Sequence, residues 1–276
     1  MDSISSSGSP IRIASLGHLA FAITMIALGV TGLRKGDFTV VWQPVIKDVP
    51  ARELLVYLSA LISLATGLGL LWRWSAAIAA RVLLAFLIIW FIVWRVRPFF
   101  TASFVESTWS AGQTLVMTSA AWILFSWFDT AWDRQHLGFM TGNKGVRIAR
   151  VIYALGLIPF GLAHFMYVQA TVVLIPGWLP WHVGWAYFTG ATFILASIAI
   201  MANVFARLAT ALSALQIGLF ALIVWLPLVA KGNLNEFQWG EFVITLALTA
   251  AAWVVADSYR GNYWFKLRTA QPTIET

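Results

Sequence analysis

Residues 54–94, LLVYLSALISLATGLGLLWRWSAAIAARVLLAFLIIWFIVW, decide the fold class of this chain. They hold two apolar runs, 53–72 and 75–94, that only a short turn with Arg73 separates. A helix of about 20 residues is ~30 Å long, which matches the hydrocarbon thickness of a lipid bilayer. The stretch therefore predicts two consecutive helices that cross a membrane in opposite directions.

The rest of the sequence extends this pattern. Hydrophobic residues make up 60% of the 276 residues and charged residues only 11%, whereas soluble domains carry about 25% charged residues. The mean hydropathy is +0.81. We therefore expect an all-α polytopic membrane protein, embedded in the lipid bilayer, with eight transmembrane helices. The six further runs lie near 15–33, 109–128, 150–167, 183–203, 205–230 and 239–257.

The charged residues predict how the chain is oriented. A net charge of +7 could indicate nucleic-acid binding in a soluble protein, but here the basic residues fall in loops and tails, so no nucleic-acid partner is expected. With eight spans both termini lie on one side, and that side carries eleven of the 18 lysines and arginines. Basic residues favour the cytoplasmic side, so we expect a cell (inner) membrane protein with both termini cytoplasmic. The opposite side carries Arg34, Lys35, Lys47, Arg52, Arg95, Arg97 and Lys231.

An internal repeat is visible when the chain is compared with itself at a shift of about 130 residues. Gly29 then falls on Gly161 and Tyr57 on Tyr187, IVWRVRP lies near IVWLP, and TSAAWILFSWFD lies over LTAAAWVVADSY. Because each unit has an even number of helices, both units enter the membrane in the same orientation. The expected architecture is two parallel-repeat four-helix bundles related by a pseudo-twofold axis along the membrane normal.

The repeat also predicts the boundaries along the chain. Residues 1–14 form a polar N-terminal tail that we expect to be disordered, and 15–128 form the first four-helix repeat. The polar, basic segment 129–149 is the expected cytoplasmic linker. The second repeat covers 150–257, and 258–276 form a cytoplasmic C-terminal tail.

The second half carries a set of motifs around a proline and tryptophan loop. These are Gly161, His164 and Phe165, then Pro176, Trp178, Leu179, Pro180 and Trp181, then Tyr187 and Gly190. In this pattern the chain resembles the DoxX-like family of four-helix integral membrane proteins, here as a tandem duplication. The first half resembles a degenerate copy, with Gly32 where His164 stands. The resemblance implies a four-helix fold and an association with quinone-linked or membrane oxidoreductase systems, so a quinone is a candidate ligand and a membrane oxidoreductase subunit a candidate partner.

Five residues of the second half are candidate ligand-binding residues. His164 falls in the last turn of its helix, where an imidazole can either bond the helix's own carbonyls or exchange protons with a ligand. Glu241 falls one turn into the last helix, and a carboxylate inside a membrane is costly unless it is paired or hydrated. We expect these two residues to converge with Trp178, His182 and Tyr187 on one extracytoplasmic cavity that the first half lacks.

The surroundings of these candidates limit the chemistry. The loop 171–180 has too few apolar residues to span the membrane, and it is the best candidate for a lid. Gln216 is expected to form a hydrogen bond between helices. The chain has no cysteine, which excludes thiol chemistry, and no carboxylate stands at ligand spacing beside His164 and His182, so no metal site is expected.

Three functions fit the sequence. The first is an auxiliary membrane protein without autonomous catalytic activity that binds a quinone or another apolar ligand in the second bundle. The second is a small-molecule transporter or export helper, and the third is a structural partner of a membrane complex. No phosphate loop, catalytic triad, haem-attachment motif or nucleotide fingerprint is visible.

Overall fold

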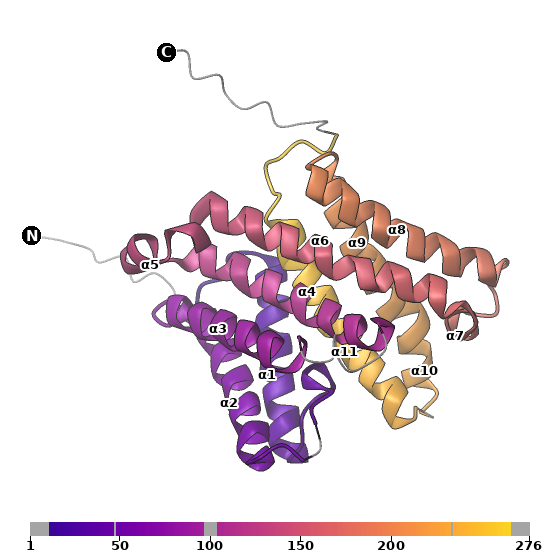
Figure 1. The fold of residues 1–276 in the computed structure, drawn as a ribbon, viewed down its shortest axis with the longest axis horizontal. Helices are drawn as coiled ribbons and strands as arrows, with labels where there is room; N and C mark the ends of the chain where they lie inside the picture. Colours follow the sequence, from indigo (N-terminus) through magenta and orange to yellow (C-terminus); the bar gives the residue numbers. More distant parts are fainter. Residues whose placement is uncertain (1–10, 47, 97–103, 233, 266–276) are drawn as a thin grey trace, which may run out of the picture.

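The computed structural model describes residues 11–46, 48–96, 104–232 and 234–265, and the regular elements in these ranges are all helices (Figure 1). The all-α prediction is confirmed, and a long helix lies at each predicted position. These helices are α1 (Leu16–Lys35), α2 (Arg52–Leu71), α3 (Ala76–Trp94), α4 (Phe104–Phe128), α6 (Gly142–Met166), α8 (His182–Ala202), α9 (Ala206–Leu219) with its continuation, and α11 (Glu236–Asp257). Shorter elements are η1 (Val40–Trp42), α5 (Ala131–His136), η3 (Gly138–Met140) and α7 (Val168–Leu174).

The seventh run is one continuous helical rod with a change of winding in it. After α9 the chain forms a π-helical segment, η4 (Phe220–Trp225), and then α10 (Leu226–Ala230). Pro227 lies in α10 and has no backbone N–H to donate, so an ordinary helix would lose one bond at this point. Wider π-helical turns accommodate such interruptions and are frequent at functional sites.

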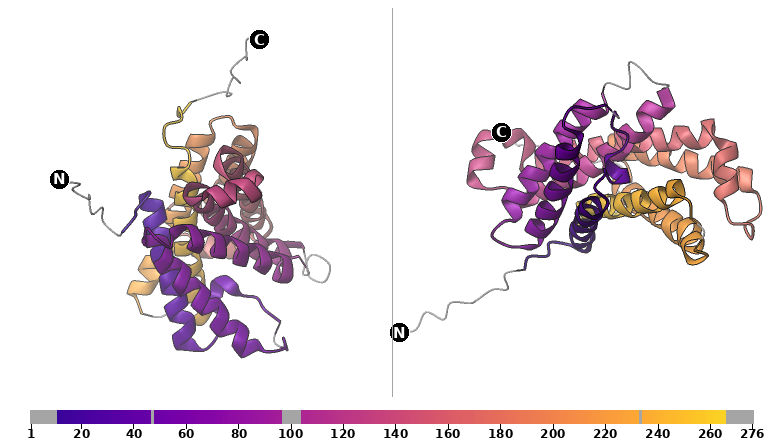
Figure 2. Two further views of the ribbon diagram at one scale, coloured as in Figure 1. Left: turned by 90° about the vertical axis from the view of Figure 1, so that its left-hand side faces the viewer. Right: turned by 90° about the horizontal axis from the view of Figure 1, so that it is seen from below.

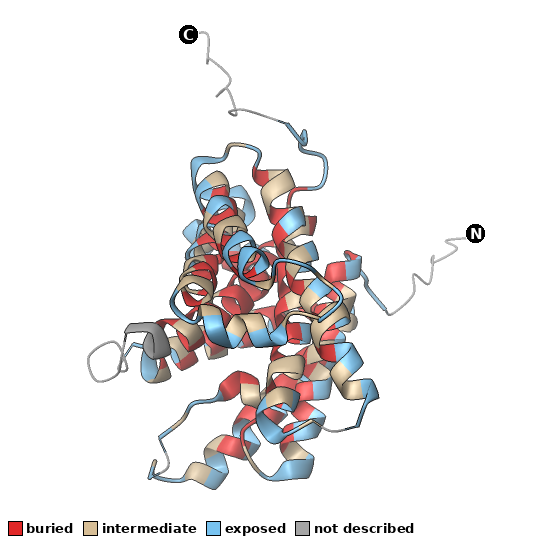
Figure 3. Ribbon diagram, turned by 90° about the vertical axis from the view of Figure 1, so that its right-hand side faces the viewer, coloured by how far each residue is buried: buried red, intermediate tan, exposed pale blue. Residues whose placement is uncertain are grey.

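Within the described residues, seven helices are long and apolar enough to cross a membrane: α1, α2, α3, α6, α8, the rod 206–230 and α11. They carry exposed aliphatic side chains such as Leu61, Ile89, Ile198 and Leu222, as expected for surfaces that contact lipid. Figure 3 shows exposed positions along the outer sides of the helices. The chain is therefore a multi-pass membrane protein. Helix α4 has a different character, because most of its described side chains are buried and several of them are polar.

The helices pack in a repeated order, with the two halves joined through their last helices. Within each half, consecutive long helices contact each other: α1 with α2, α2 with α3 and α3 with α4, then α6 with α8, α8 with α9 and α9 with α11. Across the halves, α1 packs on α11, α6 packs on α4, and α4 packs on α11. The buried apolar residues form one cluster that includes members of both halves. Where two bundles were expected, the halves share one core.

Glycines explain why helices of different halves approach so closely. A Cβ on Gly112 of α4 would lie 2.9 Å from the carbonyl oxygen of Gly156 on α6. A Cβ on Gly17 of α1 would lie 2.7 Å from the backbone of Trp253 on α11. Because lipid removes the hydrophobic drive between helices, such close backbone contacts decide which helices associate. The first helix of each half therefore lies against the last helix of the other half.

The segment 129–149 is more structured than the linker that its composition predicts. Thr130 caps α5 in a capping box with Asp133, and α6 already begins at Gly142. Arg81 donates two hydrogen bonds to the carboxylate of Asp133, one from Nε and one from an Nη, each at 2.8 Å. This ion pair ties α5 to α3, while Figure 1 shows α5 at the opposite end of the molecule from α7 and α10.

The described parts of the two tails are also ordered. Ile11 forms a β-bridge with Trp72, and the guanidinium of Arg12 lies 4.6 Å from the ring centre of Phe128. Tyr259 is buried, with the guanidinium of Arg150 3.6 Å from its ring centre. Residues 11 and 12 of the predicted N-terminal tail therefore contact α2 and α4, and residues 1–10 and 266–276 lie outside the described residues.

Acid is expected to weaken the attachment of α5. Burial alone would raise the pKa of Asp133, but hydrogen bonds from Arg81 and Thr130 outweigh it and hold this pKa below its ordinary value. A carboxylate with a lowered pKa stabilises the fold above its ordinary pKa of about 3.9, and this contribution disappears as the pH falls below that value. Asp133→Asn should therefore cost about 1–3 kcal/mol at neutral pH.

Thermal melts of the detergent-solubilised protein between pH 7 and pH 3 measure this effect. The difference in melting temperature between wild type and Asp133→Asn should shrink below about pH 4. A difference that stays constant over the whole range would show that the charge of Asp133 contributes nothing.

Candidate functional site

A large cavity lies between the helices of the second half. Its volume is about 1690 Å³, and it lies among α6, α8, α9, η4 and α11, with α7 and the following loop at its rim. Figure 2 (right) shows the reason: α8 and α7 diverge from α11 and α10 toward one end of the molecule. Pockets for drug-sized ligands usually measure about 300–1,000 Å³, so this cavity has room for a longer molecule.

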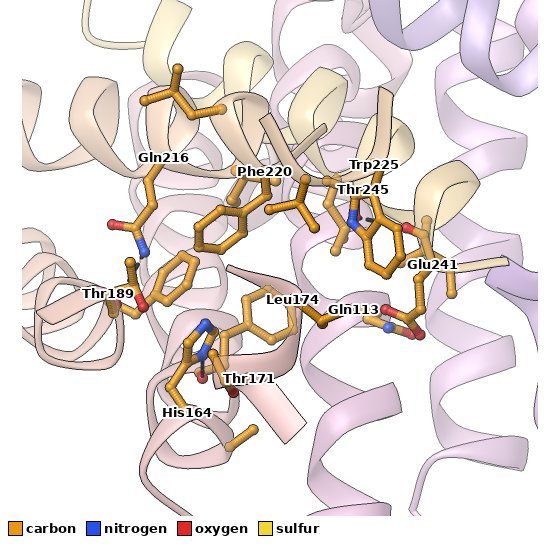
Figure 4. Close-up of a pocket in the computed structure, with 18 of the residues that line it drawn as sticks. Gln113, His164, Thr171, Leu174, Thr189, Gln216, Phe220, Trp225, Glu241 and Thr245 are labelled. Carbon is orange, nitrogen blue, oxygen red and sulfur yellow. Dashed lines mark hydrogen bonds between the residues drawn. The ribbon is translucent and has the colours of Figure 1, made fainter. Parts of the chain in front are cut away.

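The walls of the cavity are mainly apolar, and the polar residues of the lining include Asp37, Gln43, Thr171, Glu236 and Thr245 as well as two groups of neighbouring side chains. One group consists of His164, Thr189 and Gln216, and the other of Gln113 and Glu241 (Figure 4). Lys35 is the single lysine or arginine among the described residues that line the cavity. Such a lining suits a molecule that is largely apolar and carries a few hydrogen-bonding atoms.

His164 presents one ring nitrogen to its own helix and the other to the cavity. Its Nδ1 lies 2.7 Å from the carbonyl oxygen of Phe160, and because a carbonyl can only accept, Nδ1 carries a proton. Nε2 has no hydrogen-bond partner among the described residues, and the ring points into the cavity in Figure 4. Phe220 stacks on the imidazole with a centroid distance of 5.9 Å. The bond to the helix thus orients the ring, and Nε2 remains available to a ligand.

Gln216 fixes the neighbouring wall. Its Nε2 donates to the backbone oxygen of Thr189 at 3.0 Å, and its Oε1 accepts from the hydroxyl of Thr192 at 2.6 Å. These bonds join α9 to α8, as the sequence predicts for this residue. The amide of Gln216 therefore stabilises the wall and has little hydrogen-bonding capacity left for a ligand.

Glu241 and Gln113 form the second polar group. Glu241 lies in the first two turns of α11, half-buried, and Gln113 lies on α4 with 4% of its surface exposed. In Figure 4 both side chains point into the same end of the cavity. Neither side chain hydrogen bonds to another described residue, so both can bond a ligand or water. Gln113 was missed by the sequence prediction because it belongs to the first half, which packs against the second through α4.

The other three candidates are less central. Trp178 lies at the rim, with 72% of its surface exposed. His182 is the first residue of α8 and Tyr187 packs on Phe165, and neither lines the cavity. The lining face of α8 repeats at helical spacing through Trp185, Phe188, Thr189, Thr192, Phe193 and Ala196. His182 lies one turn before this face begins, and Tyr187 points off it.

The first half contributes more residues to the cavity than the sequence predicts. Asp37, Phe38, Gln43 and Pro44 from the segment between α1 and α2 all line the cavity. The expectation that the cavity belongs to the second half alone is therefore wrong. Among the described residues, no three histidine, aspartate or glutamate side chains lie close enough together to hold a metal ion.

Comparison with known proteins adds no assignment. No protein-family model, no curated protein and no solved structure matches this chain. The DoxX-like resemblance therefore stays a prediction that rests on the motifs quoted above.

Proposed function

We propose that this protein binds a neutral, lipid-like molecule with a polar ring, of the quinone class, in the cavity beside His164. The observation that carries the proposal is the combination of a volume of about 1690 Å³ with a mainly apolar wall and unpaired polar groups at His164, Gln113 and Glu241. An anionic head group would need cationic partners, and Lys35 at the end of α1 is the one lysine or arginine that the described part of the chain supplies to the lining. A neutral ligand fits these groups better.

The polar groups suit the chemistry of a quinone. A ring carbonyl accepts hydrogen bonds, which the amide of Gln113 can donate, and the reduced ring has hydroxyls that Nε2 of His164 or the carboxylate of Glu241 can accept. An imidazole and a carboxylate on one cavity can also exchange the protons that accompany reduction and oxidation of a quinone. The electrons would pass to or from a membrane oxidoreductase subunit, for which this chain would act as an auxiliary protein.

Substitution of His164 tests the proposal. Purification in mild detergent followed by lipid extraction and mass spectrometry should recover a quinone bound to the wild-type protein. His164→Ala should lower the recovered amount about three- to tenfold, because one hydrogen bond contributes about 0.5–1.5 kcal/mol.

His182→Ala is the matched control, since His182 is a histidine of the same half that does not line the cavity. Both variants should keep the melting temperature of the wild type within a few degrees. Equal recovery from His164→Ala and the wild type, or equal loss in both variants, would contradict the proposed site.

We further propose eight membrane spans with both termini in the cytoplasm of a cell with an inner membrane. The supporting observations are the length of α4 and its place between α3, α6 and α11, all of which are candidate spans. Reporter fusions after residue 140 and at the C-terminus should report the cytoplasm, and a fusion near residue 172 should report the outside. A cytoplasmic signal near residue 172 would contradict this topology.

We also propose that the two halves are a parallel repeat. The order of contacts supports it, because exchanging the first four long helices for the last four reproduces the same set of neighbours. The pairs α1 with α11 and α6 with α4 correspond, and α4 with α11 corresponds to itself. This is the pattern that a pseudo-twofold axis between α4 and α11 would produce.

One observation favours the transporter alternative. The cavity lining runs from Trp178 and Leu179 at one end of α8 to Phe205 just beyond its other end. An apolar molecule could therefore move along α8 from one side of the membrane toward the other. Transfer of a labelled quinone between the leaflets of proteoliposomes tests this function, and a protein that only binds should leave the transfer rate unchanged.

A further inference from the structure

The first half has a segment at the position of the proline and tryptophan loop, and there it is folded inward. Residues 36–51 connect α1 to α2, as residues 167–181 connect α6 to α8. Trp42 in this first segment has 1% of its surface exposed and packs edge-on against two aromatic rings of α3. The centroid distances are 5.0 Å to Phe86 and 5.5 Å to Trp90.

Arg95 holds the first segment in this position. It follows α3 directly, and its side chain is completely buried. One Nη donates to the carbonyl oxygen of Gln43 at 2.8 Å and the other to that of Pro44 at 3.0 Å. Its Nε donates to the hydroxyl of Thr114 on α4 at 3.0 Å. The rigid guanidinium thus fixes the segment 36–51 against α3 and α4.

The second half has the same elements without this clamp. The tripeptide Ile-Val-Trp precedes Arg95 at 92–94 and occurs again at 223–225, where Leu226 follows. Trp178 and Trp181 in the segment 167–181 are 72% and 86% exposed. The hydrogen bonds described for this segment stay within it or reach the ends of α6 and α8, as between Leu179 and Pro176. No described bond fixes it to α9, α10 or α11.

The segment 167–181 lies beside the cavity. Leu174, Trp178 and Leu179 lie at the rim of the cavity, and Trp225 lines its wall. The break between α6 and α7 at Tyr167 and the uncrowded Gly177 give the segment two places at which its backbone can change direction. A movement toward α10 would bring Trp178 over the cavity, as Trp42 lies over the aromatic rings of α3.

We propose that residues 167–181 form a lid that closes over the bound ligand, with Trp178 entering the cavity as Trp42 does in the first half. This inference rests on the proposed binding function for its trigger, but its structural basis is the comparison of the two segments. The closed form is the one that Arg95 holds permanently in the first half. In the second half Leu226 stands at the position of Arg95 and cannot donate these hydrogen bonds. Closure of the segment 167–181 therefore depends on its contacts with the ligand.

The absence of cysteine from the sequence makes the movement directly measurable. Cysteines at Val173 and Lys231, both exposed and outside the cavity lining, provide sites for a pair of spin labels. The distance between the labels is measured by pulsed electron paramagnetic resonance in nanodiscs. Leu226→Arg places an arginine at the position that corresponds to Arg95. It should shorten this distance by roughly one helical turn, about 5 Å, without ligand. Leu226→Gln is the matched control and should leave the distance unchanged.

A second arm adds decylubiquinone and measures its binding in the same samples by mass spectrometry. Bound quinone should shorten the distance in the wild type, and Trp178→Ala should abolish the shortening in both arms. If Leu226→Arg folds and leaves the distance unchanged, the correspondence between Arg95 and position 226 is overturned, and the lid is overturned with it unless bound quinone shortens the distance. If quinone binds without shortening the distance, closure driven by ligand is overturned while the binding proposal stands. If no quinone binds, the proposed function fails and Leu226→Arg alone decides the lid.

Discussion

Thr189→Trp is expected to lower the amount of bound ligand about tenfold or more. Thr189 faces the cavity between His164 and Gln216 (Figure 4), and its hydroxyl bonds only to carbonyls of its own helix, at Trp185 and Ala186. Replacement therefore leaves no partner unpaired on another helix. An indole at this position would overlap the ligand, and overpacking costs about 1–3 kcal/mol, where 1.4 kcal/mol is a factor of ten in affinity.

Thr189→Val is the matched control, since valine has nearly the shape of threonine and fills no additional space. It should bind ligand as the wild type does, and both variants should melt within a few degrees of the wild type. Recovery of a full complement of ligand from Thr189→Trp would mean that the ligand is bound elsewhere in the protein.

Arg95→Leu is expected to cause the largest loss of stability. The substitution leaves the carbonyls of Gln43 and Pro44 and the buried hydroxyl of Thr114 without this donor. A hydrogen bond that involves a charged group contributes about 1.5–3 kcal/mol, so the loss of all the bonds from Arg95 should cost several kcal/mol. For a chain of this size the melting temperature should fall by roughly 10 °C, because each kcal/mol corresponds to about 2–4 °C.

Arg52→Leu is the control for a general effect of losing an arginine near the membrane surface. Arg52 bonds Asp37 at 2.7 Å, but both side chains are more than a third exposed. Exposed ion pairs contribute about 0–1 kcal/mol, so the melting temperature should change little. Similar melting temperatures for Arg95→Leu and Arg52→Leu would show that Arg95 does not clamp the segment 36–51.

The fold was predictable from the sequence as far as single helices are concerned. Apolar runs of about 20 residues require helices, because only hydrogen bonds within the segment satisfy the backbone in lipid. The neighbours of each helix were not predictable, since Gly17 and Gly156 indicate a close contact without indicating the partner helix. Their partners, Trp253 and Gly112, belong to the other half of the chain.

The candidate site was predictable in part for the same reason. His164 and Glu241 line the cavity and Trp178 lies at its rim, because the end of α6, the segment 167–181 and the start of α11 all border it. Tyr187 lies on α8 but does not line the cavity. Which residues of α8 face the cavity depends on the rotation of the helix about its axis, and the sequence does not give this rotation. Gln113 could not be assigned before the packing of α4 against the second half was known.

A density map of the protein, purified from its native membrane and reconstituted in nanodiscs, tests the central claim most directly. We expect elongated density among α6, α8, α9 and α11, with a ring whose polar atom lies about 3 Å from Nε2 of His164. This density should be absent from a map of Thr189→Trp. A cavity that holds only ordered water, or a bilayer lipid whose head group stays at the membrane surface away from His164, would contradict the claim.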